Sequence, residues 1–218
     1  MKACLQKSLS EEEGFTLVEV VVTIMLMIVV LVALYSIFDM SLRTFAFSND
    51  KVEAVENARL GMERMEREIR GAYPYDKGAS PPDTHLFDPG TWTENQIKFG
   101  NELDGNRIIQ CPNSAGQCEV ISYQVYQPSG SSTYALGRAN SAAGTLQPVV
   151  EHVDYLSPTN TGLRFRYFKA DSTTEVLPAA NEDEIGMVRI ELRIRVSNQF
   201  NDGTQILSTD VALRNRGE

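Results

Sequence analysis

Residues 11–38 read EEEGFTLVEVVVTIMLMIVVLVALYSIF, and this stretch determines the predicted fold of the N-terminal part of the chain. The 19 residues 20–38 carry no charge, and Thr23, Tyr35 and Ser36 supply their only polar side-chain groups. As an α-helix they would extend about 28 Å, close to the thickness of a bilayer core. Backbone groups in lipid must hydrogen-bond internally, so we predict a membrane-spanning helix over 15–38.

Glu19 stands almost at the head of this apolar run, where a lone carboxylate would be costly to desolvate. A secretory signal peptide would have an apolar part of about 7–15 residues ending at a small-x-small site. The run here is longer, and no such site follows Ala33. A plain signal anchor would account for its length, but it would explain neither Gly14-Phe15 nor Glu19.

The segment GFTLVE, Gly14 through Glu19, resembles the cleavage and methylation motif of type IV prepilins. The resemblance implies that a prepilin peptidase cuts between Gly14 and Phe15 and that the new Phe15 amine is methylated. Residues 1–14 would then be a cleaved leader. This leader departs from the family's basic pattern, since three acids, Glu11 to Glu13, directly precede the cut.

The charges at the new terminus are consistent with this resemblance. Cleavage would leave a cationic amine on Phe15, four residues before Glu19 on the same helix. In a bundle of like helices, the Glu19 carboxylate of one subunit could face the Phe15 amine of its neighbour, which would offset desolvation and fix the axial register. In the alternative interpretation, Glu19 lies at headgroup level as an ordinary carboxylate of a helix N-terminus.

A helical period continues beyond Phe38, so we predict one helix over 15–72, with 39–72 as its amphipathic part. We expect solvated ion pairs at Glu63–Arg67 and Glu66–Arg70. The apolar stripe is expected to pack on the chain's own C-terminal sheet, with a coiled-coil dimer as the alternative. Its members are Phe45, Val52, Val55, Ala58, Met62, Met65 and Ile69.

Residues 73–218 are expected to form a β-rich head after a loop at 73–95. The clearest strand is VRIELRIRV, 188–196, where apolar and charged residues alternate with period two. Further strands are predicted at 96–99, 107–111, 120–126, 163–168 and 204–214, with a shorter one within 145–155. A turn is expected at 201–203, and loops at 128–137 and 169–186. Burial of an apolar sheet face on the amphipathic helix predicts an α+β, pilin-like fold with an antiparallel sheet.

A second resemblance concerns the head. The segments MEREIRGA, VVEHVDYL, LRFRYF, VRIELRIRV and VALRNR are similar to type II secretion pseudopilin J and to type IV minor pilin W. This resemblance covers most of the head and consists chiefly of alternating strands.

The remaining chemistry is sparse. Cys111 and Cys118 bracket CPNSAGQC, which suggests either a disulfide across a short loop in an oxidising compartment or two free thiols. Zinc is not expected, because His85 and His152 lie far apart and no second Cys or His pair exists. The acids of 182–184, together with Asp202, are more simply solvated than calcium-binding. No catalytic motif is present, so we expect neither an enzyme nor a cofactor.

These features predict a minor pilin-like structural subunit with a role in initiation or capping of a filament. The expected partners are a prepilin peptidase, other major and minor subunits, a membrane assembly platform and the lipid bilayer. The net charge is −9 and no basic patch dominates any stretch of the sequence, so direct nucleic-acid binding is not expected. We expect a single-pass protein of the cytoplasmic membrane, with an extracytoplasmic head, that moves into a surface pilus or periplasmic pseudopilus. The alternative is a membrane-anchored extracytoplasmic binding module without a filament.

Overall fold

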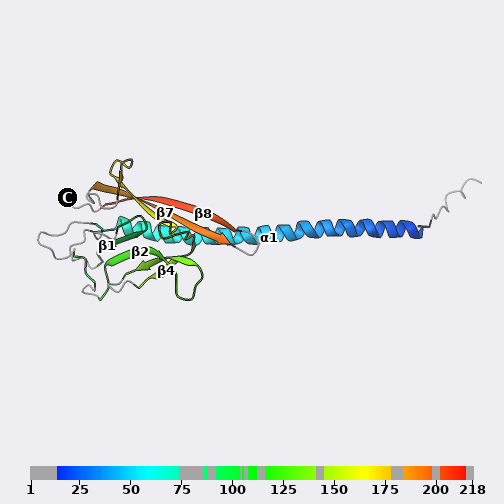
Figure 1. The fold of residues 1–218 in the computed structure, drawn as a ribbon, viewed down its shortest axis with the longest axis horizontal. Helices are drawn as coiled ribbons and strands as arrows, with labels where there is room; N and C mark the ends of the chain where they lie inside the picture. Colours follow the sequence, from blue (N-terminus) through cyan, green and yellow to red (C-terminus); the bar gives the residue numbers. More distant parts are fainter. Residues whose placement is uncertain are drawn as a thin grey trace, which may run out of the picture. The chain divides into compact units, whose positions relative to one another are not determined.

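The computed structural model describes residues 14–73, 86–87, 92–103, 105, 108–111, 116–140, 145–177, 184–197 and 202–214. The chain divides into two compact units, Met1–Ala46 and Phe47–Glu218. One long helix, α1 (Leu17–Arg70), is followed by antiparallel strands, so the fold is α+β (Figure 1). The strands are β1 (Gln96–Gly100), β2 (Val120–Tyr126), β3 (Tyr134–Ala139), β4 (Gln147–Val153), β5 (Leu163–Lys169), β6 (Glu175–Val176), β7 (Ile185–Ser197) and β8 (Asp202–Ala212).

The predicted long helix is confirmed, with α1 beginning and ending two residues inside the expected range of 15–72. Its last turn closes with two backbone hydrogen bonds. The Gly71 N–H donates to the Arg67 carbonyl at 3.2 Å, and the Ala72 N–H donates to the Ile69 carbonyl at 3.0 Å. The second of these spans three residues, which is the tighter spacing common at helix ends.

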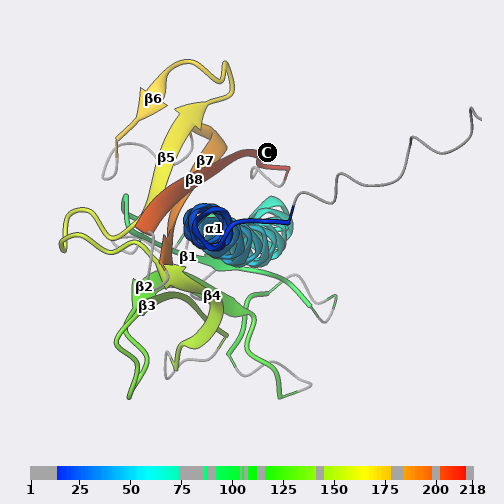
Figure 2. The same cartoon turned by 90° about the vertical axis from the view of Figure 1, so that its right-hand side faces the viewer.

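The sheet has the order β1-β2-β3-β4-β7-β5-β6, and β8 pairs with β7. β4 and β7 meet at one pair of residues, Val153 and Ile194, whereas β7 and β8 pair from Met187–Ala212 to Ser197–Asp202 without a shift in register. This short junction divides the sheet into two parts, and Figure 2 shows them on different sides of α1. The sheet therefore curls around the second half of the helix.

The core of the head forms where α1 meets the sheet. Its buried helical residues are Ala58, Gly61, Met62, Met65 and Ile69. Gly61 permits close approach of β4, because a Cβ there would lie 2.2 Å from the Cγ2 of Val150. Burial of this stripe on the chain's own sheet agrees with the expected packing.

The N-terminal part of the predicted stripe is not buried. Phe45 is 65% exposed and Val52 is 56% exposed, whereas the first buried residue of the stripe is Ala58, more than three helical turns after Phe45. The alternation of β7 is confirmed, because Val188, Ile190 and Leu192 are fully buried. The intervening Arg189, Glu191 and Arg193 are only partly buried.

Several strand assignments need correction. The glycine-rich string 128–137, predicted as a loop, contains the start of β3. The predicted strand at 107–111 is wrong for its described part, because 108–111 belong to no strand. The predicted loop at 169–186 includes β6 and the start of β7. The expected turn at 201–203 is also displaced, because Asp202 and Gly203 already belong to β8, while Asn201 lies outside the described residues.

A buried polar network ties α1 to β2 and β3. The Glu68 carboxylate accepts hydrogen bonds from Arg138 Nε at 2.9 Å, from the Tyr123 hydroxyl at 2.5 Å and from Arg64 Nε at 3.2 Å. The side chains of Glu68 and Arg138 are only 13% and 14% exposed. Burial opposes ionisation of Glu68, but the hydrogen bonds from Arg138 and Tyr123 outweigh it, so the pKa of Glu68 is lowered.

The exposed ion pairs of α1 agree only in part with expectation. Glu66 pairs with Arg70, as predicted. Glu63 pairs with Arg59 at 3.3 Å, one turn earlier than the predicted Arg67. Such i,i+4 pairs contribute a few tenths of a kcal/mol each.

We predict that Glu68→Gln lowers the free energy of unfolding by about 2 kcal/mol, because it removes the charged acceptor of a nearly buried network. Urea unfolding of the full chain in detergent measures this change. Glu63→Gln is the matched control, since Glu63 lies on the same helix in an exposed pair, and we expect a loss of about 0.5 kcal/mol or less there. Equal losses in the two variants would contradict the structural role of Glu68.

The same pair of proteins gives a pH test. The pKa of folded Glu68 lies below its ordinary value of 4.5, so its ionised network stabilises the fold above pH 4.5. That contribution is lost as the pH falls from 4.5 through the lower folded pKa. The stability difference between wild type and Glu68→Gln should therefore be full at pH 7 and shrink below pH 4.5. A difference that stays constant would contradict this assignment.

Candidate functional site at the start of the helix

Gly14 and Phe15 directly precede α1, and the Phe15 side chain is 81% exposed. Thr16 occupies the N-cap position. Its carbonyl accepts from the N–H of Glu19 at 3.1 Å, and its Oγ1 accepts from the same N–H at 3.3 Å. The Thr16 hydroxyl also lies 3.4 Å from Glu19 Oε2. Thr16 and Glu19 thus hold the positions of a capping box.

The alternative interpretation already placed Glu19 at a helix N-terminus, but the capping box with Thr16 was not predicted, although its signal is present in the sequence. Thr16-x-x-Glu19 is the T-x-x-E spacing that marks a helix N-terminus before an apolar run. The carboxylate also lies in the first turn, where the helix dipole favours negative charge. Glu19 is therefore oriented by its own helix, whichever partner it meets.

The Ser and Thr hydroxyls in the first half of α1 bond to the helix backbone. Thr23 and Ser36 of the uncharged segment, and Ser41 and Thr44 after it, each donate to a backbone carbonyl three or four residues earlier, at 2.8–3.0 Å. Such bonds hide side-chain hydroxyls from an apolar medium. α1 is the helix that is long and apolar enough, by length and composition, to cross a membrane.

Charge returns to α1 directly after Phe38. Asp39 and Arg43 form an i,i+4 ion pair of 2.8 Å. Between Gly14 and Phe38, Glu19 is the only charged residue in the sequence. The uncharged segment is thus bounded by Glu19 at its start and by the Asp39–Arg43 pair at its end.

In the head, the sulfur atoms of Cys111 and Cys118 lie 1.99 Å apart, at disulfide-bonding distance. The neighbouring Glu119 is fully buried, and it accepts from the Leu103 N–H at 3.1 Å and from the Gln110 N–H at 2.9 Å. These contacts hold the segment that was mistaken for a strand. The Gln110 N–H of the segment 108–111 therefore bonds to the Glu119 side chain, and not to a neighbouring strand.

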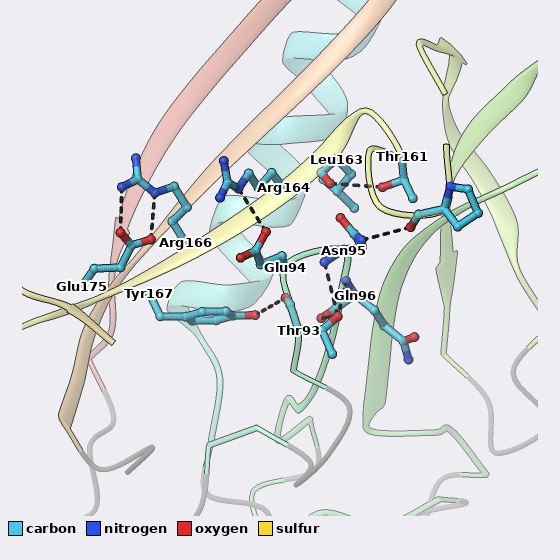
Figure 3. A network of polar contacts seen from close by, with 11 residues as sticks. Thr93, Glu94, Asn95, Gln96, Thr161, Leu163, Arg164, Arg166, Tyr167 and Glu175 are labelled. Carbon is cyan, nitrogen blue, oxygen red and sulfur yellow. Dashed lines mark hydrogen bonds and ion pairs between the residues drawn. The ribbon is translucent and has the colours of Figure 1, made fainter. Parts of the chain in front are cut away.

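A second polar region lies between the segment before β1 and strand β5, around a cleft of about 300 Å³ (Figure 3). Arg164 pairs with Glu94 at 3.3 Å, and Arg166 pairs with Glu175 at 2.8 Å. The Tyr167 hydroxyl donates to the Thr93 carbonyl at 2.9 Å. The contacts of Thr93 and Glu94 anchor the segment 93–96 to β5, and the Arg166–Glu175 pair joins β5 to β6.

Within the described residues, no group of three or more His, Cys, Asp or Glu side chains is arranged to hold a metal ion. Glu184 pairs with Lys169 at 2.7 Å, and Asp202 pairs with Arg195. Glu182 and Asp183 lie outside the described residues, as does His85. His152 is exposed on β4.

Comparisons of this chain with protein-family models, with curated proteins and with solved structures found no match. The roles expected of Gly14, Phe15 and Glu19 therefore rest on the sequence motif alone.

We predict that Cys111→Ser combined with Cys118→Ser lowers the free energy of unfolding by about 2 kcal/mol, because a disulfide closing so short a loop restricts the unfolded chain. Urea unfolding under non-reducing conditions measures this loss. Peptide mapping of the protein without reductant should recover Cys111 and Cys118 in one cross-linked peptide. Recovery of two free thiols would contradict the pairing.

Proposed function

We propose that this chain is a minor pilin-like structural subunit, made as a precursor and assembled through α1 into a pilus or a short pseudopilus. The observation that carries the proposal is GFTLVE at the head of a helix whose next 19 residues are uncharged. The side chains of this segment are exposed along its whole length. An apolar helix of this kind needs either lipid or other helices around it.

Glu19 gives the assembly its register in this proposal. Peptidase cleavage before Phe15 creates an amine about 6 Å along the helix axis from Glu19. Thr16 contacts Oε2 of Glu19, and no residue in the described part of the chain donates to Oε1. Oε1 is therefore available for the Phe15 amine of an adjacent subunit. An axial shift between two such helices would separate both charges and leave each unpaired in an apolar bundle.

The proposed location follows from the same features. The uncharged helix holds the precursor in the cytoplasmic membrane as a single span, with the head on the extracytoplasmic side. A Cys111–Cys118 disulfide fits an oxidising compartment. The proposed partners are a prepilin peptidase, a membrane assembly platform and other pilin or pseudopilin subunits. We propose a role in initiation or capping, and no catalytic role.

The first test is the N-terminus of the mature protein. Mass spectrometry of the chain purified from its native membrane should find Phe15 as the first residue, carrying a methylated amine. A matched Gly14→Leu precursor should stay uncut, because the residue before the cut is changed. A wild-type protein that retains Met1 would contradict the proposal and favour a membrane-anchored binding module.

The second test concerns Glu19. Glu19→Ala should leave cleavage intact and reduce incorporation into filaments by about tenfold or more, since the Phe15 amine loses its partner. Quantification of the subunit in sheared filaments against the membrane fraction measures this ratio. Thr16→Ala is the control, because it removes the N-cap and keeps the carboxylate. If both variants lower incorporation equally, the effect belongs to the helix cap and the register role is refuted.

A further inference from the structure

We propose that the free edge of β8 is a docking site for an extended, basic segment of another polypeptide, which would add one strand to the sheet. The inference does not depend on the proposed filament role, because it concerns the head alone. It begins with the hydrogen bonds of β8. The Leu213 N–H donates to the Gly186 carbonyl at 3.0 Å. The register then runs without a shift to Ser197–Asp202.

Hydrogen-bonded pairs alternate along an antiparallel ladder, so this bond fixes the direction of every backbone group in β8. Leu207 and Thr209 face β7. Ile206, Ser208 and Asp210 therefore point their N–H and C=O groups away from β7, toward the open edge. These backbone groups have no hydrogen-bond partner among the described residues.

The strands at the two ends of the sheet order are flanked or short. β1 is flanked by bridges from Tyr73 to Gly100 and from Phe87 to Phe99. β5 is flanked by β6 and by the hydrogen bond from the Phe165 N–H to the Glu94 carbonyl. β6 has only two residues. β8 is 11 residues long, contains no proline or lysine and has no bulge against β7, so three common obstacles to strand addition are missing from it.

The exposed side chains of β8 identify the chemistry of the partner. Asp202, Ile206 and Asp210 lie on the outer face at a spacing of four residues, and β8 has no basic residue. Arg195 and Arg189 of β7 already flank the two carboxylates on one side. A new strand with Lys or Arg opposite Asp202 and Asp210, and an apolar residue opposite Ile206, would complete the pattern on the other side.

A second copy of β8 fits this edge less well. Two-fold pairing centred on Ile206 would place Asp202 of each strand opposite Asp210 of the other, and the new strand would bring no basic residue of its own. Like charges across a strand pair are destabilising. An extended basic segment brings the opposite charge and the same backbone ladder, which is the usual mode of recognition by strand addition.

The test uses the full chain in detergent and the synthetic peptide KQTQIQTQK, which places Lys and Ile at the required spacing in either strand direction. Fluorescence anisotropy should show saturable binding, and the control peptide EQTQIQTQE should bind at least about tenfold more weakly. On addition of KQTQIQTQK, amide exchange should slow at Ile206, Ser208 and Asp210. Exchange at Leu207 and Thr209 should change little, because these amides are already bonded to β7.

Two variants block the edge in different ways. Ile206→Lys adds a positive charge at a side chain that is 67% exposed, and Ser208→Pro removes an outward N–H without removing a bond to β7. Each should weaken peptide binding at least about tenfold. Leu177→Lys is the matched control, because Leu177 is 66% exposed and lies outside β8, and its binding should be unchanged.

Three results would overturn the proposal. The first is absence of saturable binding by wild type. The second is full binding by both edge variants while their circular dichroism matches wild type. The third is concentration-dependent slowing of exchange at Ile206 and Ser208 without peptide, which would assign the edge to a second copy of this chain.

Discussion

The head depends on the packing of one helical stripe, Ala58 to Ile69, into the curl of the sheet. Two features of this unit are tied to how closely the helix can approach. Gly61 lets β4 come near, and the Glu68–Arg138 pair satisfies charges that the approach buries. Apolar burial supplies attraction without direction, whereas the Glu68 network is directional and selects one rotation of α1 against β2 and β3. The stripe and the network together hold the helix in a single orientation.

Periodicity predicted the parts of the fold where one face is buried along a whole element. β7 is such a case, because its alternate residues Val188, Ile190, Leu192 and Ile194 all belong to the buried core. β3 was missed because Gly137 lies in a string that reads as a turn. In the structure, Gly137 lies beneath the Tyr126 ring, and a Cβ there would be 2.6 Å from the ring's Cδ1. The sequence does not distinguish a glycine required for close packing from a glycine required for a turn. Only the tertiary contact shows which of the two Gly137 is.

The limits of the helical stripe and of the candidate site have a similar cause. The sequence period includes Phe45 and Val52, but burial requires a strand above each residue, and periodicity does not say where the sheet ends. The start of the helix could be predicted better, because its contacts are between residues close in sequence. Glu19 was singled out because a carboxylate is costly in an apolar setting. Its hydrogen bond with Thr16 depends on a spacing of three residues and needs no tertiary contact. The segment 108–111 is the opposite case, since the Gln110 N–H donates to a buried side chain, Glu119, and not to a neighbouring strand.

Two surfaces of the chain lack a partner within the described residues: the uncharged part of α1 and the outer edge of β8. They differ in the free energy of their exposure to water. Burying apolar side chains gains about 25 cal/mol for each Å² removed from water, so the uncharged part of α1 is strongly driven to find lipid or other helices. The outward amides and carbonyls of β8 can bond to water at little cost, because folding exchanges hydrogen bonds of similar strength. The first surface therefore needs a partner at all times, while the second can stay open until a suitable strand arrives. A partner bound at β8 can consequently come and go without exposing the core, since the bonds it makes replace bonds to solvent and leave those between β7 and β8 unchanged.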